Sequence, residues 1–256
     1  ATLGFTFLGN KVGNHQRRLD FLRFSGDLVV MSAIVLIAGA LMTGVTFGLF
    51  SLIDVSIEKI YLEYIVIWGL ASTPIVVTYL IQTNPQLVNK VSPVIAKVFT
   101  PLVFLTLVVY LIAVIITGKD PYNDRDFLML FNALLIGVMA IILFSIAETS
   151  KSSKAKITTL MLLGLSIATV LVNSIALSAI VFRITEWGIT PNRLAVLGGN
   201  ILILTNLLIV SFRLFKSVKD KKAILQVENS IASFLPIYTL WTIIVTFVFP
   251  MLFSFQ

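Results

Sequence analysis

The residues best suited to chemistry lie in one stretch, residues 183–193, which reads Arg-Ile-Thr-Glu-Trp-Gly-Ile-Thr-Pro-Asn-Arg. Arg183 and Glu186 are three residues apart, so a helix would place them on one face, and Arg193 follows closely enough to reach Glu186. The spacing predicts an Arg-Glu-Arg cluster with positive charge in excess. Because a guanidinium group holds phosphate or carboxylate oxygens through two parallel N–H bonds, this excess predicts an anion site. The alternative is a structural corner in which the three charges only pair with one another.

The middle of this stretch predicts a tight turn between two helices. Gly188 suits the left-handed position after a helix, Thr190 suits an N-cap, and Pro191 suits the first helical position. We expect Trp187 to lie at the membrane boundary and Asn192 to supply a neutral hydrogen bond to the anion site. In the structural alternative, Trp187 is only an aromatic anchor for the turn.

A second polar stretch, residues 118–126, adds Tyr122, Asp124 and Arg125 to the candidate ligand-binding residues. Gly118 can end one helix and Asn123 or Asp124 can cap the next, so local structure explains most of this sequence. The carboxylates of the stretch can also bind a cation, or complement the two arginines of the first stretch.

Amide side chains lie inside the apolar part of the sequence, at Asn132, Asn173, Asn200 and Asn206. At 1.5 Å per helical residue, Asn173 and Asn200 would lie about 15 Å and about 10 Å along their helices from the nearest arginine, and can share one depth. One interpretation makes these two amides part of a solute or lipid head-group site. The other makes them interhelical hydrogen bonds beside the small residues at positions 198 and 199.

Several kinds of chemistry are excluded by composition. The sequence contains no cysteine and one histidine, His15, so thiolate chemistry and a histidine-ligated metal or haem centre in the apolar part are excluded. The motifs of serine hydrolases, P-loop nucleotide-binding proteins and zinc proteases are also absent. We therefore expect no cofactor, no metal site and no catalytic residue, and the sequence favours a protein without catalytic activity while leaving an enzyme open as an alternative.

The elements that position these residues are long apolar runs. Hydrophobic residues make up 58% of the 256 residues, charged residues 12%, and the mean hydropathy is +1.01. A bilayer core needs about 20 apolar residues in a helix, and seven such runs predict an all-α, polytopic transmembrane bundle. They are residues 28–53, 60–81, 94–117, 127–147, 157–182, 194–215 and 234–255. Residues 15–24 and 221–231 mix basic with apolar side chains and predict short interfacial helices.

The distribution of basic residues predicts the orientation. Only five of the 19 lysines and arginines fall on the side opposite the N-terminus, namely Lys59, Lys119, Arg125, Arg183 and Arg193. By the positive-inside rule the N-terminus is cytoplasmic and the C-terminus lies outside. The net charge of +7 is spread over short loops, a pattern that favours contact with membrane lipids and excludes a nucleic-acid module.

The stretch 183–193 resembles a bacterial family of integral membrane proteins known only as a domain of unknown function. That family has an Arg-Ile-x-Glu-Tyr-Gly-x-Thr-x-Asn-Arg corner between two membrane helices, and Trp187 stands here at the position of the tyrosine. The resemblance covers about residues 100–216. It implies a bacterial cytoplasmic membrane protein, without an established activity, whose relatives extend further at the N-terminus.

Residues 1–256 are thus interpreted as one transmembrane domain and as a piece of a longer chain, with residues 1–26 as an interfacial segment and residues 27–256 as the bundle. The favoured function is binding, transport or sensing of a small anionic solute or lipid head group at an outward-facing polar pocket. One alternative is a non-catalytic subunit that docks a membrane protein partner. Another is an intramembrane enzyme acting on a lipid-linked substrate.

Overall fold

The computed structural model describes residues 15–83, 91–118, 125–149, 155–218 and 224–253, and this part of the chain consists of helices and turns without a strand. Seven of its helical segments are long and apolar enough to cross a membrane. Each closes its backbone hydrogen bonds within itself, as hydrocarbon demands. The predicted all-α, polytopic class is confirmed, and the chain is a multi-pass membrane protein.

The helices occupy the positions that hydropathy predicts. In chain order they are α2 (His15–Leu52), α3 (Glu58–Ile60), η2 (Tyr61–Val66), α4 (Ile67–Thr83), α5 (Val91–Thr117), α6 (Arg125–Thr149), α7 (Ala155–Trp187), α8 (Pro191–Ser217), α9 (Ile224–Ile243), η5 (Ile244–Val248) and α10 (Phe249–Phe253). The second span combines α3, η2 and α4, and the seventh combines α9, η5 and α10.

The two predicted interfacial helices are not separate elements. Residues 15–24 continue without a break into α2, which has 38 residues, and residues 224–231 are the first turns of α9. Gly26 does not have a positive φ, and no proline lies at either junction. Helical hydrogen bonding therefore carries through both junctions, where a left-handed residue would have ended it.

Two of the spans contain a turn of π-helix. The segment η2 precedes α4, and η5 separates α9 from α10. A π-turn closes its hydrogen bonds over five residues instead of four, so it holds one residue more than the α-helical turn it replaces. Residues after the turn consequently point in a different direction from the one that a regular helix would give them.

Contacts divide the chain into two units, residues 1–42 with 58–95 and residues 43–57 with 96–256. In the first unit, α4 buries Thr73, Val77, Leu80 and Ile81, which recur on one face. Most other side chains of this helix are exposed, as expected for a helix whose remaining surface meets lipid.

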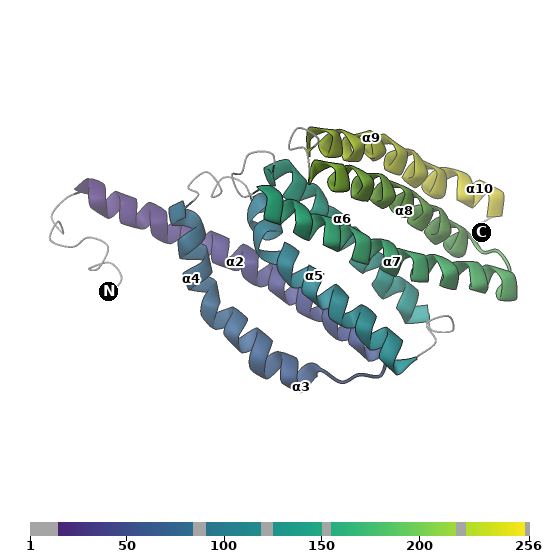
Figure 1. Cartoon of the computed structure of the whole chain (residues 1–256), viewed down its shortest axis with the longest axis horizontal. Helices are drawn as coiled ribbons and strands as arrows, with labels where there is room; N and C mark the ends of the chain where they lie inside the picture. The colour runs from purple at the N-terminus through teal and green to yellow at the C-terminus, as the bar shows by residue number, and fades with distance from the viewer. Residues whose placement is uncertain (1–14, 84–90, 119–124, 150–154, 219–223, 254–256) are drawn as a thin grey trace. The chain divides into compact units, whose positions relative to one another are not determined.

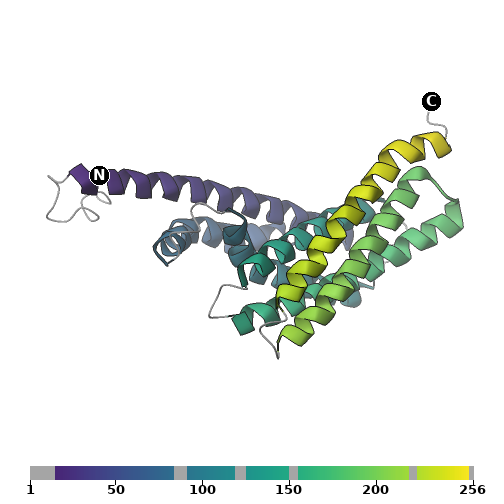
Figure 2. The same ribbon diagram turned by 90° about the horizontal axis from the view of Figure 1, so that it is seen from above.

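In the second unit α8 packs between α7 and α9, and α6 packs on α7 (Figures 1 and 2). Tyr110 of α5 lies edge-on between Phe50 and Phe131, with ring centroids 5.7 and 5.8 Å apart. All three rings are buried. These aromatic contacts join α5, α6 and the end of α2 within this unit.

At Gly198 of α8, a side chain of α9 packs directly against the helix backbone. A Cβ at this position would overlap the indole ring of Trp241 in α9. The same indole donates its N–H to the carbonyl oxygen of Ala195 at 3.2 Å. A glycine is therefore needed at position 198 to bring this large ring against the backbone of α8.

Candidate anion-binding pocket

The turn between α7 and α8 has the chemistry that its sequence predicts. Gly188 has a φ of +77°, and its N–H donates to the carbonyl oxygen of Ile184 at 3.0 Å. The hydroxyl of Thr190 accepts a hydrogen bond from the backbone N–H of Arg193 at 3.3 Å, and Pro191 begins α8. Gly188 thus ends α7, and Thr190 caps α8 two residues later. The predicted hairpin is confirmed.

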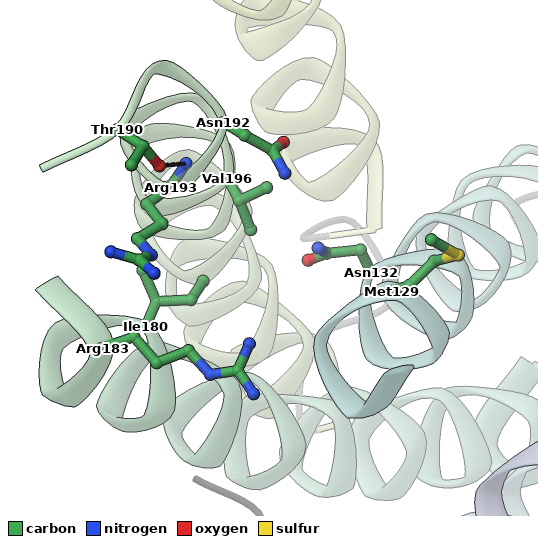
Figure 3. A pocket seen from close by; sticks show the side chains of 8 residues that line it. All are labelled: Met129, Asn132, Ile180, Arg183, Thr190, Asn192, Arg193 and Val196. Atoms are coloured by element: carbon green, nitrogen blue, oxygen red, sulfur yellow. Dashed lines mark hydrogen bonds between the residues drawn. The ribbon is translucent and has the colours of Figure 1, made fainter. Parts of the chain in front are cut away.

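A pocket of about 490 Å³ opens beside this turn. Its walls come from the first turns of α6, the last turns of α7, the connecting turn and the first turns of α8 (Figure 3). It is lined by Met129, Asn132, Ile180, Arg183, Thr190, Asn192, Arg193 and Val196. The two arginines and two asparagines are hydrogen-bond donors, and no carboxylate is among the described residues that line the pocket.

Arg193 is fixed by the end of the preceding helix. Its Nη1 donates to the carbonyl oxygens of Trp187 at 2.9 Å and Gly188 at 2.8 Å. These carbonyls belong to the C-terminal end of α7, where backbone oxygens lack intrahelical partners and attract a cation. Of the three guanidinium nitrogens, only Nη1 donates hydrogen bonds to other described residues. The remaining two can donate to a ligand.

Arg183 approaches the pocket from α7 with its side chain largely buried, since the residue is only 7% exposed. Figure 3 shows its guanidinium group pointing toward the space in front of Asn132. The guanidinium carbons of Arg183 and Arg193 lie 5.9 and 5.7 Å from the ring centroid of Trp187. Both contacts are within the range of cation–π attraction. The indole therefore helps to hold two like charges at one site.

The position of Glu186 contradicts the predicted Arg-Glu-Arg cluster. Its side chain is exposed, it does not line the pocket, and it forms no ion pair with Arg183 or Arg193. Three-residue spacing places Arg183 and Glu186 on roughly one helix face, but Arg183 is directed inward while Glu186 faces outward. Arg193 binds the backbone carbonyls at the end of α7 instead of the carboxylate. The Arg-Glu-Arg cluster is therefore not formed.

The amides Asn173 and Asn200 lie together but outside the pocket. Asn173 Nδ2 donates to the carbonyl oxygen of Asn200 at 3.1 Å, and the two residues are 0% and 2% exposed. Gly198 is two residues earlier in α8 and lies against Trp241 of α9, on another side of the helix. The contact between Asn173 and Asn200 has the geometry of an interhelical hydrogen bond, one of the two interpretations that the sequence allows.

The other candidate residues are only partly placed. Tyr122 and Asp124 lie outside the described residues. Arg125 is described only as the first residue of α6. Asn192 lines the pocket with an exposed side chain, as expected for a ligand-binding residue.

Sequence reasoning missed the contribution of α6. Met129 and Asn132 line the pocket from this helix, opposite the two arginines (Figure 3). The Oδ1 atom of Asn132 is buried and has no hydrogen-bond partner among the described residues. The only signal in the sequence is a lone amide at the sixth residue of the apolar run 127–147. Its neighbours across the pocket depend on tertiary packing, which spacing along the chain does not reveal.

Comparisons of the chain with known protein families, with curated proteins and with solved structures find no match. The resemblance of residues 183–193 to a bacterial membrane family therefore stays a prediction. What the geometry offers is a concave site with two fixed cations, neutral amide groups and one unsatisfied acceptor, on the end of a membrane helix hairpin.

Proposed function

We propose that this membrane protein binds the anionic group of a small solute or lipid head group in the pocket between α6, α7 and α8. One observation carries the proposal: Arg183 and Arg193, from two different helices, line one pocket, and no described carboxylate lines it with them. Guanidinium groups hold phosphate and carboxylate oxygens better than any other side chain because their donors form a planar fork.

The position of the pocket adds to this argument. It lies at the N-terminal end of α8, where backbone N–H groups point outward and the helix dipole favours negative charge. By the distribution of lysine and arginine this end of the hairpin faces the outside of the cell. We propose a bacterial cytoplasmic membrane as the location, with binding, sensing or transport of the anion from the outer side.

The test is the thermal stability of the protein purified in mild detergent, with anions added. The panel is inorganic phosphate, sn-glycerol 3-phosphate and short-chain dioctanoyl phosphatidylglycerol. A ligand that binds only the folded state stabilises it by about 2.7 kcal/mol at one hundred times its Kd. We expect at least one member of the panel to raise the melting temperature of the wild type, and Arg193→Gln to abolish that rise.

Lys216→Gln is the matched control. Lys216 lies near the other end of α8, exposed, with its ammonium 4.5 Å from the ring of Phe212. Its substitution removes the same charge from the same helix without touching the pocket, and should leave the ligand-induced rise intact. The proposal fails if no member of the panel stabilises the wild type, or if Arg193→Gln and Lys216→Gln respond alike.

A further inference from the structure

The depth of the pocket in the membrane follows from helix length. The helix α7 has 33 residues, which at 1.5 Å per residue is about 50 Å. A bilayer is about 30 Å thick in its hydrocarbon core and about 40–45 Å with its head groups. The end of α7 therefore reaches beyond the hydrocarbon. Ile180 is seven residues from the end of that helix and Val196 five residues from the start of α8, so the pocket lies at the level of the head groups.

The pocket also reaches a lipid-facing surface. Met129 lines it and is 66% exposed. Ala133 and Ile136 follow on α6 at steps of four and three residues, and both are exposed, Ile136 at 64%. Residues at this spacing share one helix face. An apolar stripe thus runs from the mouth of the pocket along α6 toward the membrane interior, and an acyl chain can follow it.

The polar groups of the pocket suit a ligand that has a hydrogen-bond donor as well as an anionic group. Arg183, Arg193 and Asn192 offer donors that suit phosphate oxygens. The buried Oδ1 of Asn132, by contrast, is an acceptor without a described partner. A buried acceptor that stays unsatisfied destabilises the folded protein. A phosphodiester has acceptors only, so it cannot satisfy this oxygen, whereas a hydroxyl group elsewhere in the ligand is a donor that suits Asn132.

We infer that the pocket takes the head group of an anionic phospholipid that carries hydroxyl groups, such as phosphatidylglycerol, and that the lipid enters from the bilayer past Met129. The inference rests on the proposed anion binding and names its ligand class. The phosphodiester lies between the two arginines, a head-group hydroxyl donates to Asn132, and an acyl chain lies along the stripe of α6.

The test compares half-maximal concentrations for thermal stabilisation in mild detergent. The probes are dioctanoyl phosphatidylglycerol, dioctanoyl phosphatidic acid, dioctanoyl phosphatidylcholine and soluble sn-glycerol 3-phosphate. For the wild type we expect phosphatidylglycerol to act at a concentration at least tenfold below that of glycerol 3-phosphate. Phosphatidylcholine, which has no hydroxyl in its head group and no net charge, should have no effect at that concentration.

Two variants separate the parts of the inference. The wild type should bind phosphatidylglycerol more tightly than phosphatidic acid, which lacks the glycerol hydroxyls of the head group. Asn132→Leu should remove this difference while both lipids still bind. Asn192→Leu should raise the half-maximal concentration severalfold. Asn192 makes no hydrogen bond with another described residue, so its loss should leave folding intact even if Arg193→Gln impairs it. Lys216→Gln is again the control.

The outcomes separate this inference from the proposed function. Equal stabilisation by glycerol 3-phosphate and phosphatidylglycerol overturns the lipid ligand but leaves anion binding in place. An equal effect of phosphatidylcholine shows general lipid solvation and overturns the inference as well. Failure of all phosphate-containing probes on the wild type removes both.

Discussion

At the residue scale, the interface between α8 and α9 depends on the difference between two adjacent glycines. A Cβ at Gly198 would overlap the indole of Trp241, whereas a Cβ at Gly199 would meet the same ring at 3.8 Å, an ordinary contact distance. Both residues lie inside α8 and carry the same intrinsic cost in a helix. Only their neighbours differ, so the pair isolates packing from helix propensity.

Gly198→Ala should lower the free energy of unfolding in detergent by about 1–3 kcal/mol, because the ring of Trp241 must move and lose its bond to Ala195. Gly199→Ala should cost less than Gly198→Ala by at least about 1 kcal/mol, and can stabilise through helix propensity. The measurement is the shift in the midpoint of denaturation. Equal effects of the two substitutions would show that α9 does not pack against α8 in this way.

At the element scale, the hairpin of α7 and α8 is held by local chemistry at its turn. Thr190 and Thr205 lie in the same hairpin but use their hydroxyl groups differently. The hydroxyl of Thr190 accepts the backbone N–H of Arg193, which has no partner inside the helix. The hydroxyl of Thr205 donates to the carbonyl oxygen of Ile201, which helical hydrogen bonding also serves. Thr190→Val and Thr205→Val remove the same atom with the same change in shape.

Thr190→Val should therefore destabilise the protein by about 1 kcal/mol, the usual loss when an N-cap is removed. Thr205→Val, at an exposed position of a membrane helix, should change stability by less than about 0.5 kcal/mol. Denaturation in detergent of both variants measures the difference. If Thr205→Val proves as harmful as Thr190→Val, the cap is not what stabilises the start of α8.

The same hairpin shows why the sequence predicts some features and not others. Gly188, Thr190 and Pro191 act on their own neighbours, so their types alone predict the turn. Glu186 was assigned to the site because spacing predicts a shared face, but spacing does not say whether that face is turned inward. Asn132 of α6 forms a wall of the pocket through contacts with segments about 50 residues away in the chain. Hydropathy does not predict such contacts.

At the scale of the whole molecule, seven spans follow from hydropathy because a bilayer imposes one length on every helix. The orientation depends on a separate property, the excess of basic residues on one side. Since the chain contains no cysteine, any cysteine introduced into it is a unique chemical label. Glu186 lies beside the turn between α7 and α8, and Lys216 lies near the other end of α8. Both are exposed, which makes them suitable positions for a cysteine label.

We expect a membrane-impermeant maleimide added to intact cells to label Glu186→Cys and not Lys216→Cys, and permeabilised cells to label both. The reason is that α8 is long and apolar enough to cross the membrane between these positions, and that the proposed orientation keeps the lysine-rich end in the cytoplasm. Labelling of Lys216→Cys alone in intact cells would reverse the proposed orientation. Labelling of both would contradict a crossing by α8.

The π-turn η5 makes the seventh span sensitive to length in a way that residue type does not predict. Five residues, Ile244–Val248, separate the end of α9 from Phe249. Phe249 is buried and meets Trp241 edge-on at 5.9 Å. Removal of any one of those residues would restore a regular α-helix and turn Phe249 by about 100°, onto another side of the span. Deletion of one residue here would thus disrupt the packing of Phe249 against Trp241, whereas a conservative substitution such as Ile244→Val would preserve it. Homologues of this protein should therefore differ in these five residues by substitution and not by deletion.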